Sequence, residues 1–363
     1  WTPAEVADAL RPDDPKLALA AWDVTEGGNW HEGHGRTILR RVRTDGDLAA
    51  TFGWTAEEVA DRLERVRAIL LTARDRRPQP NRDDKVLAGW NGLAIAALAE
   101  AAVAIEVIGD PAELARAAGY RAAAIAAANV CVDHLLGADG RLGRSWKDGR
   151  SSGAGVLEDY ACLAEGLLAL YDATFDERWF RVGRGLADTI LARFSDPAGG
   201  FFDTADDHEI LITRPRELQD NAVPSGGAMA ATVLLRLAAL TGEGRYRDAA
   251  EGAIQAVIEV APAHPTFFGQ WLAAIEFALA EVDEIAIAGD PAAETTGRLL
   301  AIVDAGFQPF QVRAVSADPT ASSIELLAGR FAIDGRPTAF VCHGFACRLP
   351  VVEPAALADL LAR

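Results

Sequence analysis

Long, almost purely apolar stretches that are rich in alanine and spaced for helices recur along this chain at a regular interval. The first covers Asn91–Val107, where only two residues are charged. Similar stretches begin at Glu158 and at Ser225, each 67 residues after the one before, and a fourth begins near Gln270. A helix that is apolar on every side is buried on every side. The chain therefore has to surround each of these helices with others.

Amphipathic helical segments alternate with the apolar ones, and they cover Glu113–Leu136, Arg178–Phe194 and Arg245–Val260. A long period with two helices per unit indicates stacked helical hairpins. Buried inner helices ringed by amphipathic outer helices describe an α/α toroid. An open solenoid is the alternative, but its inner helices would carry more polar residues than these do. The sequence predicts a mainly α fold of toroid-like helical hairpins.

The last 80 residues of the chain have a different character. They alternate expected strands with expected helices, in the order Glu284–Gly289, Glu294–Ala305, Gln311–Val315, Thr338–Cys342 and Pro354–Leu361. Strand, helix and strand in this order favour a small parallel α/β unit with a right-handed crossover. We therefore expect two domains, a toroid over 1–283 and a small α/β subdomain over 284–363.

The composition restricts the partners and the compartment. Lys and Arg number 35 against 53 Asp and Glu, which gives a net charge of −18. Such a chain has no general attraction to nucleic acid or to anionic membranes. We see no apolar run approaching the roughly 18 residues of a membrane span, and expect neither partner. Four cysteines are few, which indicates a reducing, cytoplasmic location. The chain begins with Trp1, and we expect it to be part of a longer protein.

Polar and aromatic residues gather where the four apolar helices begin. In a toroid alternate helices run the same way, so these four ends are expected to meet at one mouth. Aromatic faces, carboxylates and amides together suit a sugar. Each polar residue alone is also explained as a helix cap, but four clusters in phase favour a small polar ligand. The residues expected to contact it are Trp90, Asn91, Tyr160, Asn221, Ser225, Gln270 and Trp271.

The loop 199–208 adds aromatic residues, three aspartates and a histidine to the candidates. Two carboxylates can act as acid and base in glycoside cleavage, and a histidine can move a proton beside a carbonyl. A turn with solvated acids is the alternative. We expect His208 to approach a carboxylate of Asp203, Asp206 or Glu158. The acid–base candidates are Asp84, Glu158, Asp159, Asp203, Asp206 and His208.

The remaining histidines and cysteines do not form a recognisable metal or redox motif. His31 and His34 lie in a glycine-rich stretch where a helix is not expected, so no metal site is predicted there. Cys342 and Cys347 are five residues apart, too far for a redox pair of the two-residue-spacing type, and no second cysteine pair completes a zinc site. We expect reduced thiols with a structural role, and we expect no metal or cofactor in this chain.

The chain resembles the thioredoxin-domain-containing proteins of bacteria and animals that include the vertebrate spermatogenesis-associated protein. The matching stretches are WTPAEV, WDVTEGGNW, RDDKVLAGWNGLAIAALAEAA, LEDYACLAEGLLALYDATFDERWF, GGFFDTADDHEILITRPRELQDNAVPSG and FVCHGFACRLPV. The resemblance implies an N-terminal thioredoxin-like domain followed by an (α/α)6 toroid. That toroid is similar to N-acylglucosamine 2-epimerases and six-hairpin glycosidases.

This chain departs from that pattern in two ways. The thioredoxin-like domain is missing, and four inner helices are found where the resemblance implies six. The first and last inner helices should each leave an apolar flank open. We expect a missing upstream segment, the 1–55 region or a second copy of the chain to cover it, so that the isolated chain dimerises or aggregates. The related epimerases use histidines on inner helices as acid and base, and the four inner helices here carry none.

These observations favour a carbohydrate-active or sugar-derivative-binding domain, of glycosidase or sugar epimerase/isomerase type, with carboxylates at the mouth. The alternative is a non-catalytic binding or scaffold module that serves the thioredoxin-like domain. Geometry separates the two, because catalysis needs two carboxylates facing a common site. In a scaffold the acids would be spread out or paired with arginine and lysine.

Overall fold

The computed structural model describes residues 1–10, 14–209 and 212–362. The chain divides into two compact units, Trp1–Asp83 and Asp84–Arg363. The sequence led us to expect a boundary near 283 instead. Secondary structure does change there, because a strand begins at Asp283, but this change lies inside the second unit.

The first unit is a small helical bundle with its own core. Leu17, Leu48 and Leu63 are buried at its centre. Three of its helices begin at a threonine whose side-chain oxygen accepts a hydrogen bond from the backbone N–H three residues on, which stabilises a helix start by about 1 kcal/mol. The helices are α1 (Pro3–Ala9), α2 (Asp14–Trp22), α3 (Asp45–Phe52) and α4 (Ala56–Asp75).

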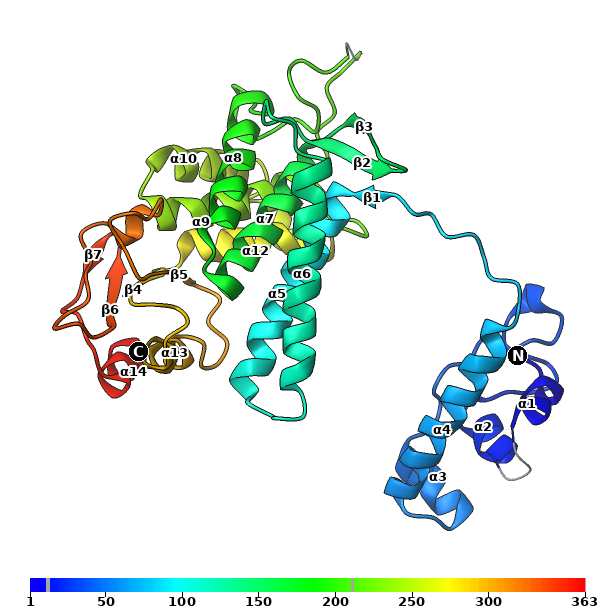
Figure 1. Cartoon of the computed structure of the whole chain (residues 1–363). Coiled ribbons are helices and arrows are strands. Elements are labelled where there is room, and N and C mark those ends of the chain that lie inside the picture. The colour runs from blue at the N-terminus through cyan, green and yellow to red at the C-terminus, as the bar shows by residue number, and fades with distance from the viewer. Residues whose placement is uncertain (11–13, 210–211, 363) are drawn as a thin grey trace. The chain divides into compact units, whose positions relative to one another are not determined.

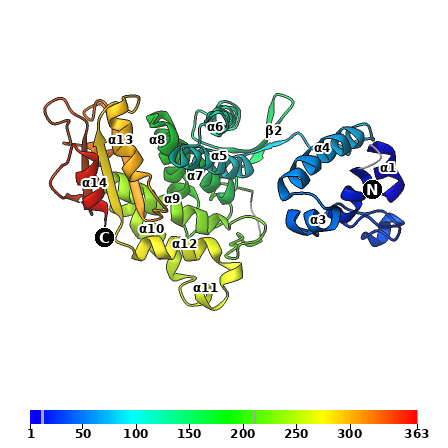
Figure 2. The same cartoon turned by 90° about the horizontal axis from the view of Figure 1, so that it is seen from below.

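The second unit contains a row of inner helices and an outer set that packs behind them (Figures 1 and 2). Along the row, α5 packs against α7, α7 against α9, and α9 against α12, while α6, α8 and α10 pack behind α5, α7 and α9. The helices are α5 (Ala88–Ile108), α6 (Leu114–His134), α7 (Leu157–Thr174), α8 (Glu177–Arg193), α9 (Gly226–Thr241), α10 (Gly244–Gln255), α11 (Val260–Ala263) and α12 (Gly269–Leu279). The predicted mainly α fold of helical hairpins is confirmed.

Burial along the row follows the position of each inner helix. The middle helices α7 and α9 are buried on nearly every side. The end helices are not: α5 exposes Trp90, Ala94, Ala97 and Ile108 along one flank, and α12 exposes Leu279. Within the described part of this unit, the row of inner helices is therefore open at both ends, as expected for an incomplete ring.

Helix α5 also corrects one expectation. Among the described residues it is the one helix that is long and apolar enough, by length and composition, to cross a membrane. The expectation that no apolar run approaches the length of a membrane span is therefore wrong for α5. In the structure Ile95, Ala99 and Ala102 of α5 are buried within the core of the bundle.

The seam between α5 and α7 depends on two glycines. A methyl group added to Gly92 would lie 2.3 Å from the Cys162 carbonyl, and one added to Gly166 would lie 2.4 Å from the Gly92 carbonyl oxygen. Both distances are far below any van der Waals contact. The absence of side chains at these positions lets the two backbones touch, and it brings the N-terminal ends of α5 and α7 together.

A three-stranded antiparallel sheet lies next to these helix ends, and sequence analysis missed it. Its strands are β1 (Val86–Leu87), β2 (Gly143–Lys147) and β3 (Arg150–Ala154), in the order β1-β2-β3. The dipeptide Asp148-Gly149 was the sequence signal for the β2–β3 hairpin. Both residues have a positive φ in the structure, which is the backbone conformation that tight hairpin turns require.

The C-terminal segment of this unit forms a four-stranded sheet in the order β5-β4-β6-β7. The expected parallel pairing holds only for β4 with β5. Strand β6 pairs antiparallel with β4, and β7 pairs antiparallel with β6. Between β5 and β6 the chain contains only the short turn η3 (Glu325–Leu327), not the crossover helix that parallel strands need. The elements are β4 (Asp283–Ala288), α13 (Glu294–Val303), β5 (Gln311–Ser316), β6 (Thr338–His343), β7 (Ala346–Cys347) and α14 (Pro354–Leu361).

The expected redox state of the two cysteines in this sheet was also wrong. Cys342 on β6 and Cys347 on β7 face each other in the antiparallel register and form a disulfide, where we expected reduced thiols. The five-residue spacing suits a short hairpin, because it places the two cysteines at paired positions on adjacent strands. Cys131 and Cys162 are free and buried.

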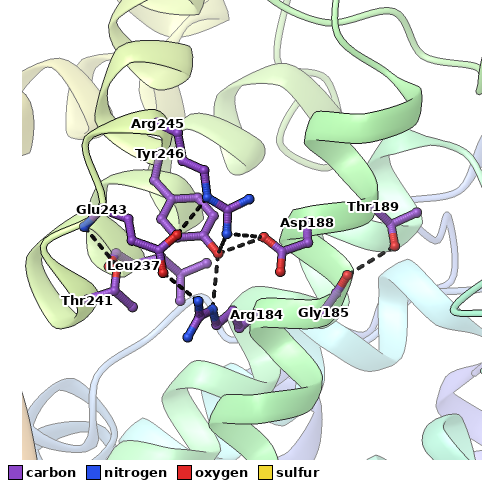
Figure 3. Close-up of polar contacts among 9 residues, drawn as sticks. All are labelled: Arg184, Gly185, Asp188, Thr189, Leu237, Thr241, Glu243, Arg245 and Tyr246. Carbon is purple, nitrogen blue, oxygen red and sulfur yellow. Dashed lines mark hydrogen bonds and ion pairs between the residues drawn. The ribbon is translucent and has the colours of Figure 1, made fainter. Parts of the chain in front are cut away.

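A polar cluster joins the outer helices α8 and α10 (Figure 3). The buried Tyr246 hydroxyl donates to Asp188 at 2.7 Å and accepts from Arg245 at 2.8 Å and Arg184 at 3.3 Å. Glu243 pairs with both arginines. Burial raises the pKa of Tyr246 to about 12, so the hydroxyl stays protonated and keeps donating.

We expect Tyr246→Phe to lower the free energy of unfolding by about 1 kcal/mol, because it removes a buried hydroxyl that bonds to three side chains, while those side chains remain partly exposed and paired with one another. Urea unfolding of the full chain measures this. Thr189→Ala is the control, since within the described residues the Thr189 hydroxyl bonds to the Gly185 carbonyl of its own helix and to no other group, and we expect a change within about 0.5 kcal/mol. Equal losses in the two variants would contradict a tie between α8 and α10.

Candidate functional site

The N-terminal ends of α5, α7, α9 and α12 come together, and we call this region the mouth. A methyl group added to Gly89 of α5 would lie 3.4 Å from Oε1 of Glu158 on α7, and one added to Gly226 of α9 would lie 2.8 Å from the Glu158 nitrogen. Glycines at these positions let three helix starts surround one glutamate. The equal spacing in the sequence therefore does bring the polar clusters of these helices together.

Asp159 holds the mouth together. Its carboxylate accepts from the Gly89 N–H at 3.2 Å and from the Val156 N–H at 3.0 Å, and it pairs with Arg144 at 3.3 Å. The side chain is buried. Burial raises the pKa of Asp159, although these three partners act in the opposite direction. Its contacts explain Asp159 as a structural link between α5, α7 and the β2 strand.

Glu158 and Asp203 form the candidate acid–base pair. Burial raises the pKa of Glu158, and the nearby charges of Asp159 and Asp203 raise it further. Burial also raises the pKa of Asp203, whose Oδ2 accepts from the Glu217 N–H at 2.8 Å. The helix dipole favours ionised acids in a first turn by roughly 0.3–1 kcal/mol, so desolvation and repulsion are the larger effects here. Within the described residues, neither carboxylate makes an ion pair, unlike Asp159.

Asp220 connects the other two helix ends, and sequence reasoning missed its role. One carboxylate oxygen accepts from the Ser225 N–H and the other from the Gln270 N–H, both at 2.8 Å. Ser225 itself caps α9. An aspartate just upstream of a serine cap was the available signal, but it did not reveal that the second oxygen reaches another helix.

Two expected ligand contacts are engaged inside the protein at this end. The Gln270 side chain donates to the Thr232 hydroxyl at 2.8 Å. The buried Trp271 indole donates to the Leu218 carbonyl at 2.8 Å. These bonds satisfy polar groups that we expected to face a ligand.

Tyr160 and His208 line a different space, a cavity of about 390 Å³ that Arg141 and Asp207 also line. The Tyr160 hydroxyl accepts from the Leu142 N–H at 2.8 Å. Nδ1 of His208 is buried without a hydrogen-bond partner. No ion pair joins His208 to a carboxylate in the part of the chain that is described, so the expected approach is not made by direct contact.

The other candidates lie at the edge of this region. Asp206 pairs with Arg193 at 3.4 Å. Trp90 is 62% exposed on the open flank of α5, and the Asn91 amide donates to the Leu87 carbonyl at 2.8 Å. Asp84 and Asn221 are exposed.

Arg144 is the functional residue that sequence analysis missed most clearly, because it lies on the hairpin that was not predicted. Its guanidinium touches Asp159, and its charge lowers the pKa of Glu158. Among the described residues, no group of three or more His, Cys, Asp or Glu side chains is placed to hold a metal ion.

The chain is similar to curated proteins of animals over nearly its whole length, while no family model matches it. It is 30% identical to human spermatogenesis-associated protein 20 over 383 residues, and 29% identical to the mouse protein over 385 residues. Each match covers 99% of this chain and 47% of the other. An uncharacterized protein of Caenorhabditis elegans is 24% identical over 97% of this chain.

The chain thus spans about half the length of the curated relatives it matches, and it is homologous to that half of spermatogenesis-associated protein 20. The thioredoxin-like segment stays a prediction. Among solved structures, cellobiose 2-epimerase from Spirochaeta thermophila matches 47% of this chain and 42% of its own, with 20% identity and a TM-score of 0.36.

We expect Asp159→Ala to lower the free energy of unfolding by about 2–3 kcal/mol, because it leaves the Gly89 and Val156 N–H groups without their acceptor. Glu158→Ala, one residue earlier, removes no hydrogen bond of this kind and should cause no comparable loss. Urea unfolding of both variants tests the difference. Similar losses would remove the structural distinction between these neighbouring acids.

We expect Glu158→Gln and Asp203→Asn to raise stability at neutral pH. The pKa of each carboxyl is higher in the folded state, so the folded protein binds the proton more readily and wild-type stability falls as pH rises through this window. The amides do not titrate. Their advantage should therefore grow as the pH rises above about 4, as measured by urea unfolding at a series of pH values. A gain that persists undiminished at pH 3 would exclude ionisation as its cause.

Proposed function

We propose that the mouth binds a sugar or a sugar-derived ligand, and that Glu158 and Asp203 exchange protons with it. The observation that carries the proposal is the pair itself: two desolvated carboxyls, with the charge of Asp203 raising the pKa of Glu158, and neither of them in an ion pair among the described residues. Keeping such a pair costs stability, so it is retained where the acids have a chemical use.

The pair suits acid–base chemistry. A general acid has to hold its proton and a general base has to be ionised, and burial of one carboxyl beside a second shifts the pair toward sharing these two roles. In glycoside cleavage one carboxyl protonates the leaving oxygen, while the other activates water or attacks the anomeric carbon. In epimerisation or isomerisation a carboxylate removes a proton from the carbon next to a carbonyl and returns it.

The ion pairing of the other acids argues against the scaffold alternative. Asp159 pairs with Arg144, Asp206 with Arg193 and Asp207 with Arg141, as a structural role predicts. Glu158 and Asp203 are left out of this pattern. That difference favours a reactive pair over a module that only supports a thioredoxin-like domain.

A ligand screen by thermal shift tests the proposal. The full chain is incubated with monosaccharides, disaccharides and N-acylated amino sugars, and a true ligand raises the melting temperature by mass action. Hits are then followed by NMR in D2O. A glycosidase releases a new reducing end, whereas an epimerase or isomerase introduces deuterium at the carbon next to the carbonyl.

We expect Glu158→Gln and Asp203→Asn each to lower turnover at least 100-fold while the thermal shift remains, since general acid–base catalysis typically contributes 10²–10⁴-fold. Glu251→Gln is the matched control, because Glu251 lies on α10 and pairs with Arg247 at 2.6 Å. Turnover that is unchanged in the two mouth variants would remove the pair from the mechanism. A screen in which no sugar shifts the melting temperature would count against a carbohydrate ligand.

A further inference from the structure

Arg330 is a buried guanidinium that contacts two sulfur atoms. It lies just after η3 and is 9% exposed. Its Nη2 and Nε lie 3.0 Å and 3.2 Å from Sγ of Cys347, and Nη2 lies 3.6 Å from Sγ of Cys342. In the described chain it makes no ion pair, and the one oxygen that accepts from it is the Ala328 carbonyl. Glu284 and Glu325 act on it only through their charge at longer range.

Apart from the Phe345 ring, whose centre lies 5.9 Å from the guanidinium carbon, no group in direct contact with Arg330 in the described chain offsets its charge strongly while the disulfide is intact. A buried charge is costly unless an anion or strong hydrogen bonds offset it, and a sulfur atom is a weak acceptor. Burial accordingly lowers the pKa of Arg330. A thiolate at Cys347 would place an anion where the guanidinium already points.

The two cysteines differ in access. Cys342 is fully buried on β6, whereas Cys347 is an exposed residue on the edge strand β7. An external thiol is therefore expected to approach the disulfide from the side of Cys347. Exposure of one cysteine and a positive charge beside it are the conditions under which cysteines become reactive.

We propose that Cys342 and Cys347 form a thiol–disulfide exchange site for external thiols, in which the reduced pair is held as a Cys347 thiolate against Arg330. The site is separate from the mouth and does not depend on the proposed function.

With a dithiol as reductant, the exchange balances as follows. One thiolate of the dithiol attacks Sγ of Cys347, a mixed disulfide forms, and the bond to Cys342 breaks with its electron pair on Cys342, which then takes up a proton. The second thiol of the reductant attacks its own sulfur in the mixed disulfide, and Cys347 leaves as the thiolate. The dithiol loses two electrons and two protons. The protein gains both electrons and one proton, and the other proton goes to solvent.

Alkylation of the full chain tests the site. After reduction with dithiothreitol and its removal, iodoacetamide is added for short times between pH 5 and 10, and each cysteine is followed by mass spectrometry. We expect Cys347 to reach half of its maximal rate at least one pH unit below the ordinary cysteine value of about 8.5. Arg330→Gln should move that midpoint back up by at least one unit, and Arg330→Lys, which keeps the charge, should move it less.

Two further measurements guard against misfolding. Cys131 and Cys162 are buried, and burial raises the pKa of both, that of Cys131 to about 12. They should stay unmodified in every variant that is folded. Cys342→Ser keeps Arg330 and leaves Cys347 as a lone thiol, so it should retain the low midpoint without any reduction step.

The proposal is overturned if Cys347 in folded Cys342→Ser titrates like an ordinary thiol, or if its midpoint is the same with and without Arg330. It is also overturned if native wild-type protein in millimolar reduced glutathione keeps the disulfide intact. Reduction by glutathione together with a midpoint that depends on Arg330 supports it.

Discussion

Direct backbone contact between α5 and α7 is the constraint on which the second unit depends. Gly92 and Gly166 remove the side chains that would hold these helices apart. Once the backbones touch, the first turns of both helices lie side by side, and the Gly89 N–H is within reach of Asp159. The position of Glu158 follows, because it is fixed on one side by α5 and on the other by Gly226 of α9. A pair of interior glycines thus determines the geometry of a polar site at the end of the helices.

The mouth also shows how two adjacent acids acquire different properties. Successive residues on a helix point about 100° apart, so Asp159 turns toward backbone donors while Glu158 turns toward another carboxyl. Burial raises the pKa of both. Among the described residues, Asp159 accepts two backbone hydrogen bonds and makes an ion pair, whereas Glu158 feels Arg144 only through its charge.

The apolar periodicity predicted the helices well, because a helix buried on every side requires a composition that almost nothing else produces. Equal spacing also survives in the structure, where α5, α7 and α9 start at Ala88, Leu157 and Gly226. What the periodicity cannot show is where a side chain points within the first turn. Trp271 and Gln270 lie at the expected helix end, yet their polar atoms bond inward.

Other features depend on contacts between segments far apart in the sequence. Arg330 reaches the two cysteines only because η3 packs beside the β4–β6 sheet, and no spacing rule connects an arginine to cysteines 12 and 17 residues away. The disulfide itself follows from a strand register that the sequence did not specify.

The hairpin with Arg144, in contrast, was predictable from Asp148-Gly149, a dipeptide that favours tight hairpin turns.

The glycine seam has a mechanical consequence. Two helices whose backbones touch leave no side chains that can slide or change rotamer between them, so this part of the mouth acts as a rigid wall. Any change in the width of the mouth therefore has to come from other parts of its rim, such as the β2–β3 hairpin. The hairpin is joined to the wall by the pairing of β2 with β1, which leads directly into α5, and by the ion pair between Arg144 and Asp159. Only the Arg144 side of that pair is exposed to water, so the attachment of the hairpin to the rigid wall depends mainly on backbone pairing and little on salt.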